Sequence, residues 1–81
     1  MNMERMQLKG LLVESQRKYK TLDTEASGLI ILIRSALSPY QEDMTKLEID
    51  KVKTYINRLN LVILDLKELK SKIEKLEREF E

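Results

Sequence analysis

Apolar residues recur at alternating steps of three and four along the second half of the chain. The series is Val52, Tyr55, Leu59, Val62, Leu66, Leu69, Ile73, Leu76 and Phe80. A mean step of about 3.5 residues is typical of a helix whose apolar stripe packs against another helix in a coiled coil. The pattern therefore predicts a long helix that depends on a second helix for its stability.

The first half of the chain repeats this rhythm. The series is Leu8, Leu12, Ser15, Tyr19, Leu22, Ala26, Leu29, Ile33 and Ala36. It predicts a first helix over about residues 3–37. Gly28 weakens that helix by about 1 kcal/mol relative to alanine. Thr21, Asp23 and Thr24 form a second weak point, and a break there would give three helices instead of two.

Start signals for a second helix follow Leu37. Ser38 is a candidate N-cap, Pro39 suits the first helical position, and Gln41 completes a capping box with the serine. The carboxylates of Glu42 and Asp43 would lie near the positive end of the helix dipole. These signals predict a turn near residues 37–39 and a second helix over about residues 39–81.

Two long helices joined by so short a turn are expected to fold back on each other. The predicted fold class is therefore all-α, a long antiparallel helical hairpin of coiled-coil type that forms a single domain over residues 1–81. If facing residue numbers sum to about 78, Ala26 meets Val52 and Ser15 meets Val62, in a hairpin roughly 50–60 Å long. The aromatic side chains are predicted to lie in its core: Tyr19, Tyr40, Tyr55 and Phe80.

The chain carries more apolar residues than one hairpin can bury. Isoleucines recur every seven residues beside the second stripe, and further apolar residues lie outside both stripes. Left exposed, they would form a patch of a size that monomers rarely show. We expect these residues to form the interface of a homodimer, a four-helix bundle of two hairpins. The predicted interface consists of Ile30, Ile31, Leu32, Ile49, Ile56, Leu61, Ile63 and Leu64.

Other assemblies would cover the same surplus. A tetramer would do so, and so would an adaptor's complex with a helix of another protein. From Leu66 onward the apolar stripe is flanked by dense charge, which also suits a parallel coiled coil between two chains. The sequence leaves these alternatives open.

Composition argues against most enzymatic chemistry. The 81 residues include no histidine and no cysteine, so a thiol nucleophile, a zinc site of the usual ligands and a disulfide are excluded. We expect a non-enzymatic protein without a cofactor, a metal or a small-molecule substrate. No secretory signal is visible at the N-terminus, and the longest apolar run, Leu29 to Ile33, is far shorter than the ~20 residues of a membrane span. A cytoplasmic protein without membrane contact is expected.

Nucleic-acid binding is a second alternative. Fifteen basic residues balance fourteen acidic ones, which is not the charge of a nucleic-acid-binding domain. In the predicted register Arg17, Lys18 and Lys20 would lie beside Arg58 as a weak basic patch. Acidic residues lie among them and no aromatic residue is interleaved for base stacking. A solvated helix face is the favoured interpretation.

Two segments carry a resemblance to known proteins. They are the turn region Ile33-Arg34-x-x-Leu37-Ser38-Pro39 and the closing segment from Ile73 to Phe80, IEKLEREF. Together they resemble small two-helix proteins of unassigned function from Mu-like bacteriophages and prophages. The resemblance implies a phage-encoded accessory role in a bacterial cytoplasm. It carries over no functional residue.

Overall fold

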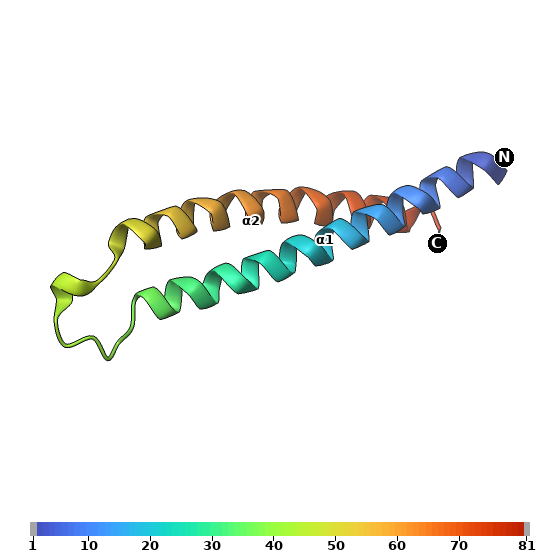
Figure 1. The fold of residues 1–81 in the computed structure, drawn as a ribbon. Helices are drawn as coiled ribbons and strands as arrows, with labels where there is room; N and C mark the ends of the chain where they lie inside the picture. Colours follow the sequence, from blue (N-terminus) through green and yellow to red (C-terminus); the bar gives the residue numbers. More distant parts are fainter. Residues whose placement is uncertain (1, 81) are drawn as a thin grey trace.

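The structure, a computed structural model, describes residues 2–80 and is a helical hairpin (Figure 1). Helix α1 (Asn2–Ala36) and helix α2 (Ile49–Arg78) run antiparallel, and the connection between them contains a short 3-10 helix, η1 (Met44–Lys46). The molecule is 65 Å long and 16 Å across in both other directions. The predicted all-α hairpin is confirmed.

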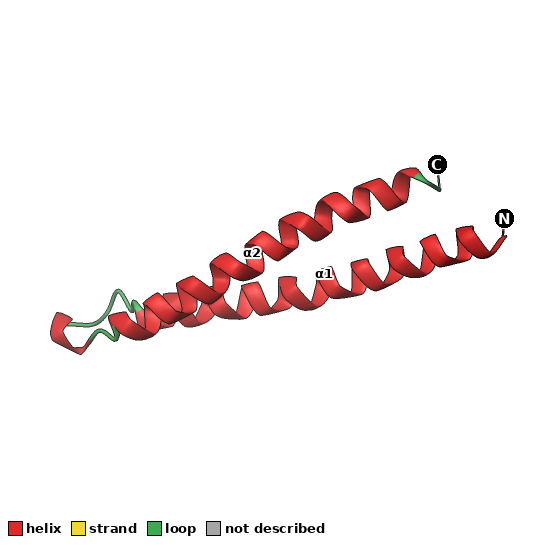
Figure 2. Cartoon of the chain, turned by 90° about the horizontal axis from the view of Figure 1, so that it is seen from above, coloured by secondary structure: helices red, strands yellow, loops and turns green. Residues whose placement is uncertain are grey.

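The two helices wrap around each other along their length. Near the connection they lie apart in Figure 1, whereas near the termini they lie apart in the perpendicular view of Figure 2. The plane of the hairpin therefore turns from one end to the other, as in a coiled coil. The N-terminal end of α1 projects beyond the end of α2 (Figure 1).

Both predicted stripes lie between the helices. All of their residues are buried or partly buried, whereas most of their neighbours are exposed. The buried residues of the described chain all have small side chains: Ser15, Ala26, Val52 and Val62. Val62 is the most enclosed of them, with 1% of its surface exposed. The core is thus a single thin seam one side chain thick.

Helix α1 is continuous through both predicted weak points. The hydroxyl groups of Thr21 and Thr24 donate to the carbonyls of Arg17 and Lys20, at 3.1 and 3.0 Å. These bonds direct the threonine hydroxyls to carbonyls of the preceding turn, where they leave the helix intact. Gly28 lies in the same uninterrupted helix, so two long helices form rather than three.

The predicted start of the second helix is wrong. Helix α2 begins at Ile49, not near Pro39, and the connection spans residues 37–48. Ser38 does accept a hydrogen bond from the amide of Tyr40, but this bond closes a turn and not a helix. Asp43 instead caps η1, accepting from the amide and the hydroxyl of Thr45 at 3.1 and 2.6 Å. These bonds lower the pKa of the Asp43 carboxyl.

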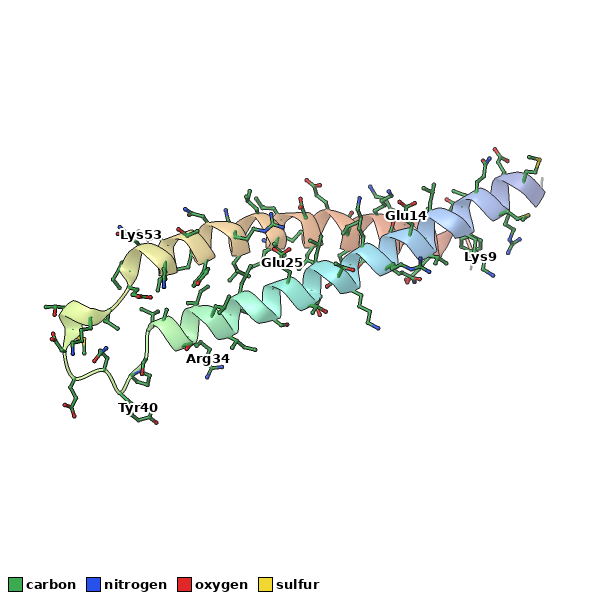
Figure 3. The ribbon with its side chains drawn as sticks, in the orientation of Figure 1. Lys9, Glu14, Glu25, Arg34, Tyr40 and Lys53 are labelled. Atoms are coloured by element: carbon green, nitrogen blue, oxygen red, sulfur yellow. The ribbon has the colours of Figure 1, made fainter. Side chains whose placement is uncertain are left out.

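The physical reason lies in the stripe itself. Continued backward from Val52, its positions would be occupied by Glu48, Thr45 and Gln41, all of them polar. A helix over residues 39–48 would place its apolar residues, Tyr40, Met44 and Leu47, outside the seam, and most helical stability in proteins comes from burial of an apolar face. Tyr40, predicted to lie in the core, is consequently 90% exposed in the connection (Figure 3).

The longer connection also changes the register. Glu25 contacts Arg58 and Arg5 lies over the ring of Phe80, so facing residue numbers sum to 83–85 instead of 78. Helix α2 is thus displaced along α1 by one heptad from the predicted position. The same two stripes still meet, but each residue faces one that lies seven positions away from its predicted partner. Periodicity leaves such a shift undetermined, because every heptad offers the same apolar pair of positions.

Candidate interaction surface

The seam between the helices is bordered by two different sides. Residues seven apart in a supercoiled helix lie on the same side of it. In an antiparallel pair, the same heptad position of both helices borders the same side of the seam. One side carries Glu25 and Arg58. The other carries Gln16 and Lys70, which line one groove between the helices.

The first side is polar over most of its length. Arg58 donates from Nε to Glu25 Oε2 at 2.5 Å and from Nη2 to Oε1 at 2.9 Å. This two-point bond, more than the guanidinium charge, lowers the pKa of the Glu25 carboxyl. One heptad toward the termini, Lys18 and Asp65 line the next groove on this side. Opposite charges thus face each other along the middle of this side, whereas Leu11 and Leu32, 43 and 46% exposed, lie toward its ends.

The second side changes character along its length. Toward the termini it carries Gln16, Lys70 and Glu77 around a shallow groove. Toward the connection, steps of seven residues lead to aliphatic side chains on both helices, after Asp23 on α1. We call these residues the aliphatic patch: Ile30, Leu37, Ile49, Ile56 and Ile63. Their side chains are 45, 43, 44, 48 and 38% exposed, in that order. The patch occupies only the half of the hairpin next to the connection.

A basic rim borders the aliphatic patch. Residues three or four positions away on a helix are neighbours, which places Arg34 beside Ile30 and Lys53 between Ile49 and Ile56. Figure 3 shows Arg34 and Lys53 projecting from opposite outer edges of the hairpin. We define the rim by the six residues that follow these two edges at steps of seven, of which Lys20 lies beside Asp23 and the others beside the patch: Lys20, Ser27 and Arg34 on α1, and Lys53, Asn60 and Lys67 on α2. Four are basic and none is acidic.

The structure brings together half of the predicted interface. Ile30, Ile49, Ile56 and Ile63 share the aliphatic patch, and all are exposed as expected. The remaining predicted residues are exposed elsewhere, with Leu32 on the polar side and three on the outer faces: Ile31, Leu61 and Leu64.

Leu37 belongs to the aliphatic patch but was not predicted there. Its amide donates to the carbonyl of Ile33 at 3.0 Å, so the backbone still follows the helix at this residue. A signal was present in the sequence, because Leu37 follows Ile30 by seven residues. The predicted turn near residues 37–39 includes it instead.

The predicted basic patch is not formed as expected. Arg58 pairs with Glu25, and Lys18 lies one heptad away beside Asp65. Arg17 and Lys20 occupy other positions around α1, on its outer face and in the basic rim. The error follows directly from the register, since a shift by one heptad exchanges the facing residues.

The open end of the hairpin has its own small contact. The guanidinium of Arg5 lies 5.5 Å from the centre of the Phe80 ring, a cation–π distance. Met6, Lys9 and Leu12 complete a shallow groove there. This contact places Phe80, two residues past the end of α2, against α1.

Over residues 2–80 the structure contains no group of three or more acidic side chains placed to hold a metal ion. In the same part of the chain, neither helix has a stretch apolar enough to cross a membrane. The surface feature that stands out is therefore the aliphatic patch with its basic rim. Comparison with known proteins finds no match, since no family model, no curated protein and no solved structure is significantly similar to this chain.

Proposed function

We propose that this chain is a non-enzymatic helical-hairpin protein that self-associates through the aliphatic patch into a four-helix bundle. The observation that carries the proposal is the patch itself. Five large aliphatic side chains lie on one side of one half of the hairpin, each between 38 and 48% exposed. Exposed apolar surface of this continuity is typical of an interaction site.

Thinness of the core supports association. The hairpin has one seam, and only four of the described residues are buried in it. Chains of this size rarely gain sufficient stability from a single small core and commonly add disulfides, metals or oligomerisation. Because the sequence has no cysteine and no histidine, association is the remaining means of stabilisation.

Replacement of Ile63 by aspartate tests the proposal. Ile63→Asp places a charge inside the aliphatic patch, and we expect the variant to sediment as a monomer with reduced helical circular dichroism. Val13→Asp is the matched control, because Val13 is 44% exposed but lies outside the patch in the other half of α1. The proposal fails if Ile63→Asp stays as associated and as helical as Val13→Asp.

An adaptor role is the second candidate. Ile31, Leu61 and Leu64 are 67, 55 and 49% exposed on the outer faces, where a second hairpin on the aliphatic patch would not reach. Leu61 and Leu64, three positions apart on α2, suit an amphipathic helix of another protein, which docks through apolar side chains at such spacings. In that case Leu61→Asp would abolish capture of the partner and leave self-association unchanged.

The proposed setting is a bacterial cytoplasm, with an accessory role encoded by a phage or prophage. Support for this comes only from the resemblance of the turn region and the closing segment to proteins of Mu-like phages. Production of the protein during prophage induction, followed with an antibody against the chain, tests it.

A further inference from the structure

We propose that two hairpins associate through the aliphatic patch in opposite directions, with the two connections at opposite ends of the dimer. This inference rests on the proposed self-association and specifies its geometry. It places a two-fold axis beside Ile56, the middle patch residue of α2, and beside Ile30, which faces Ile56 from α1. Only the halves next to the connections then overlap.

The distribution of aliphatic residues supports this overlap. Ile49, Ile56 and Ile63 are evenly spaced by seven residues, so a two-fold axis at Ile56 places Ile49 of one copy against Ile63 of the other. Beyond Ile63 the same side continues with the charged residues Lys70 and Glu77, which border a shallow groove. Opposed hairpins bury the aliphatic half of each copy and leave these polar halves in water.

The basic rim decides between the two directions. In opposed hairpins α2 lies on α2 of the second copy, and the axis at Ile56 places Lys53 beside Asn60. On α1, Arg34 comes beside Ser27 in the same way. The two basic rim residues nearest the axis, Arg34 and Lys53, therefore each meet a neutral residue, and their like charges are kept apart.

Parallel hairpins would bring like charges together. In that arrangement α1 lies on α2 of the second copy. The residues that face each other between copies are then the same ones that face each other within one hairpin. Arg34 then faces Lys53 and Lys20 faces Lys67, and the two-fold axis repeats each contact. Asp23 faces an aliphatic side chain in either arrangement and does not distinguish them. Like-charge contacts at a rim disfavour one arrangement even where the apolar match is equal.

A distance between spin labels tests the direction. Tyr40 is 90% exposed in the connection, and the chain has no other cysteine, so Tyr40→Cys gives one label per copy. From the helical rise, the ten residues between Ile30 and Tyr40 span about 15 Å, so opposed hairpins place the two labels roughly 30 Å apart along the dimer, whereas parallel ones place them at the same end, roughly 15–20 Å apart. A long distance that vanishes on dilution with unlabelled protein supports the inference, and a short one overturns it.

Charge variants give an independent readout. With opposed hairpins, Asn60→Lys brings two lysines together and raises the dissociation constant several-fold at low salt, whereas Lys53→Glu leaves it nearly unchanged. Parallel hairpins would reverse this, because Lys53→Glu would pair with Arg34 and tighten the dimer. A wild-type chain that is monomeric at every concentration would instead refute the proposed self-association, so the two failures are distinguishable.

Discussion

Glu25 and Arg58 lie 33 residues apart in the sequence and are joined by two hydrogen bonds across the helix pair. A guanidinium and a carboxylate in this fork geometry fix orientation as well as distance. The pair therefore marks the register of the hairpin, which the apolar stripes leave ambiguous by whole heptads. Its side chains are 36 and 53% exposed, so the pair specifies alignment more than it adds stability.

Charge reversal tests the register. Arg58→Glu places a second carboxylate beside Glu25, and we expect a lower thermal midpoint by circular dichroism. Glu25→Lys combined with Arg58→Glu restores the pair with its charges exchanged, and the midpoint should recover. In the register predicted from the sequence, where facing residue numbers sum to about 78, Arg58 would lie near Lys20. Arg58→Glu alone would then raise the thermal midpoint instead.

The pH dependence of stability follows from the lowered pKa of Glu25. The hydrogen bond from Arg58 is the main cause, so the carboxyl binds its proton less readily in the folded hairpin than in the unfolded chain. A lowered folded-state pKa gives stability that is complete above the ordinary pKa, 4.5 for this group, and is lost as the pH falls through the folded value. Thermal midpoints of Glu25→Gln should fall less steeply with acid than those of the wild type.

Asp43 provides the control for that titration. Its pKa is lowered as well, by hydrogen bonds from Thr45 within the connection. Asp43→Asn should therefore flatten the acid limb independently of Glu25→Gln. Equal acid slopes in the wild type and in Glu25→Gln would contradict a folded-state pairing of Glu25 with Arg58.

Val62 is expected to be among the most sensitive seam positions. Its side chain is 1% exposed, and Val62→Ala removes two buried methyl groups and leaves a small cavity. We expect a loss of about 2 kcal/mol in the free energy of unfolding. Val13→Ala removes the same groups from a side chain that is 44% exposed and should cost less than about 0.5 kcal/mol. Chemical denaturation of both variants at one protein concentration measures the difference, and similar losses would contradict the thin-seam core.

Gly28 is a site where the chain can be stabilised. An added Cβ would meet no atom within 4 Å, and no glycine of the described chain has a positive φ angle. Gly28→Ala should therefore raise the free energy of unfolding by about 1 kcal/mol through helix propensity alone. Gly28→Pro, which removes a backbone donor inside α1, should instead disrupt the helix. A lower stability of Gly28→Ala would indicate a close contact at this face of α1.

The sequence was sufficient to predict the seam. Burial in a two-helix contact depends on the helical period alone, so residues such as Ser15 and Val62 could be assigned without knowing their partners. The position of α2 along α1 could not be assigned in this way. It depends on the length of the connection, and Ser38 and Pro39 imitate a helix start although the stripe positions after them are polar.

The aliphatic patch was predicted in part for a related reason. The spacing of Ile49, Ile56 and Ile63 identified one flank of α2 directly. On α1 the matching flank could not be separated from the outer face, because Ile30 and Ile31 are adjacent and both apolar. The pairing of Glu25 with Arg58 was needed to show which flanks adjoin.

Solution mass across a dilution series tests the central claim most directly. A single chain has a mass of 9.6 kDa. Light scattering on the wild-type protein should give twice that mass at high concentration, falling toward the single-chain value on dilution. A mass of 9.6 kDa at every concentration, with full helicity, would contradict self-association through the aliphatic patch.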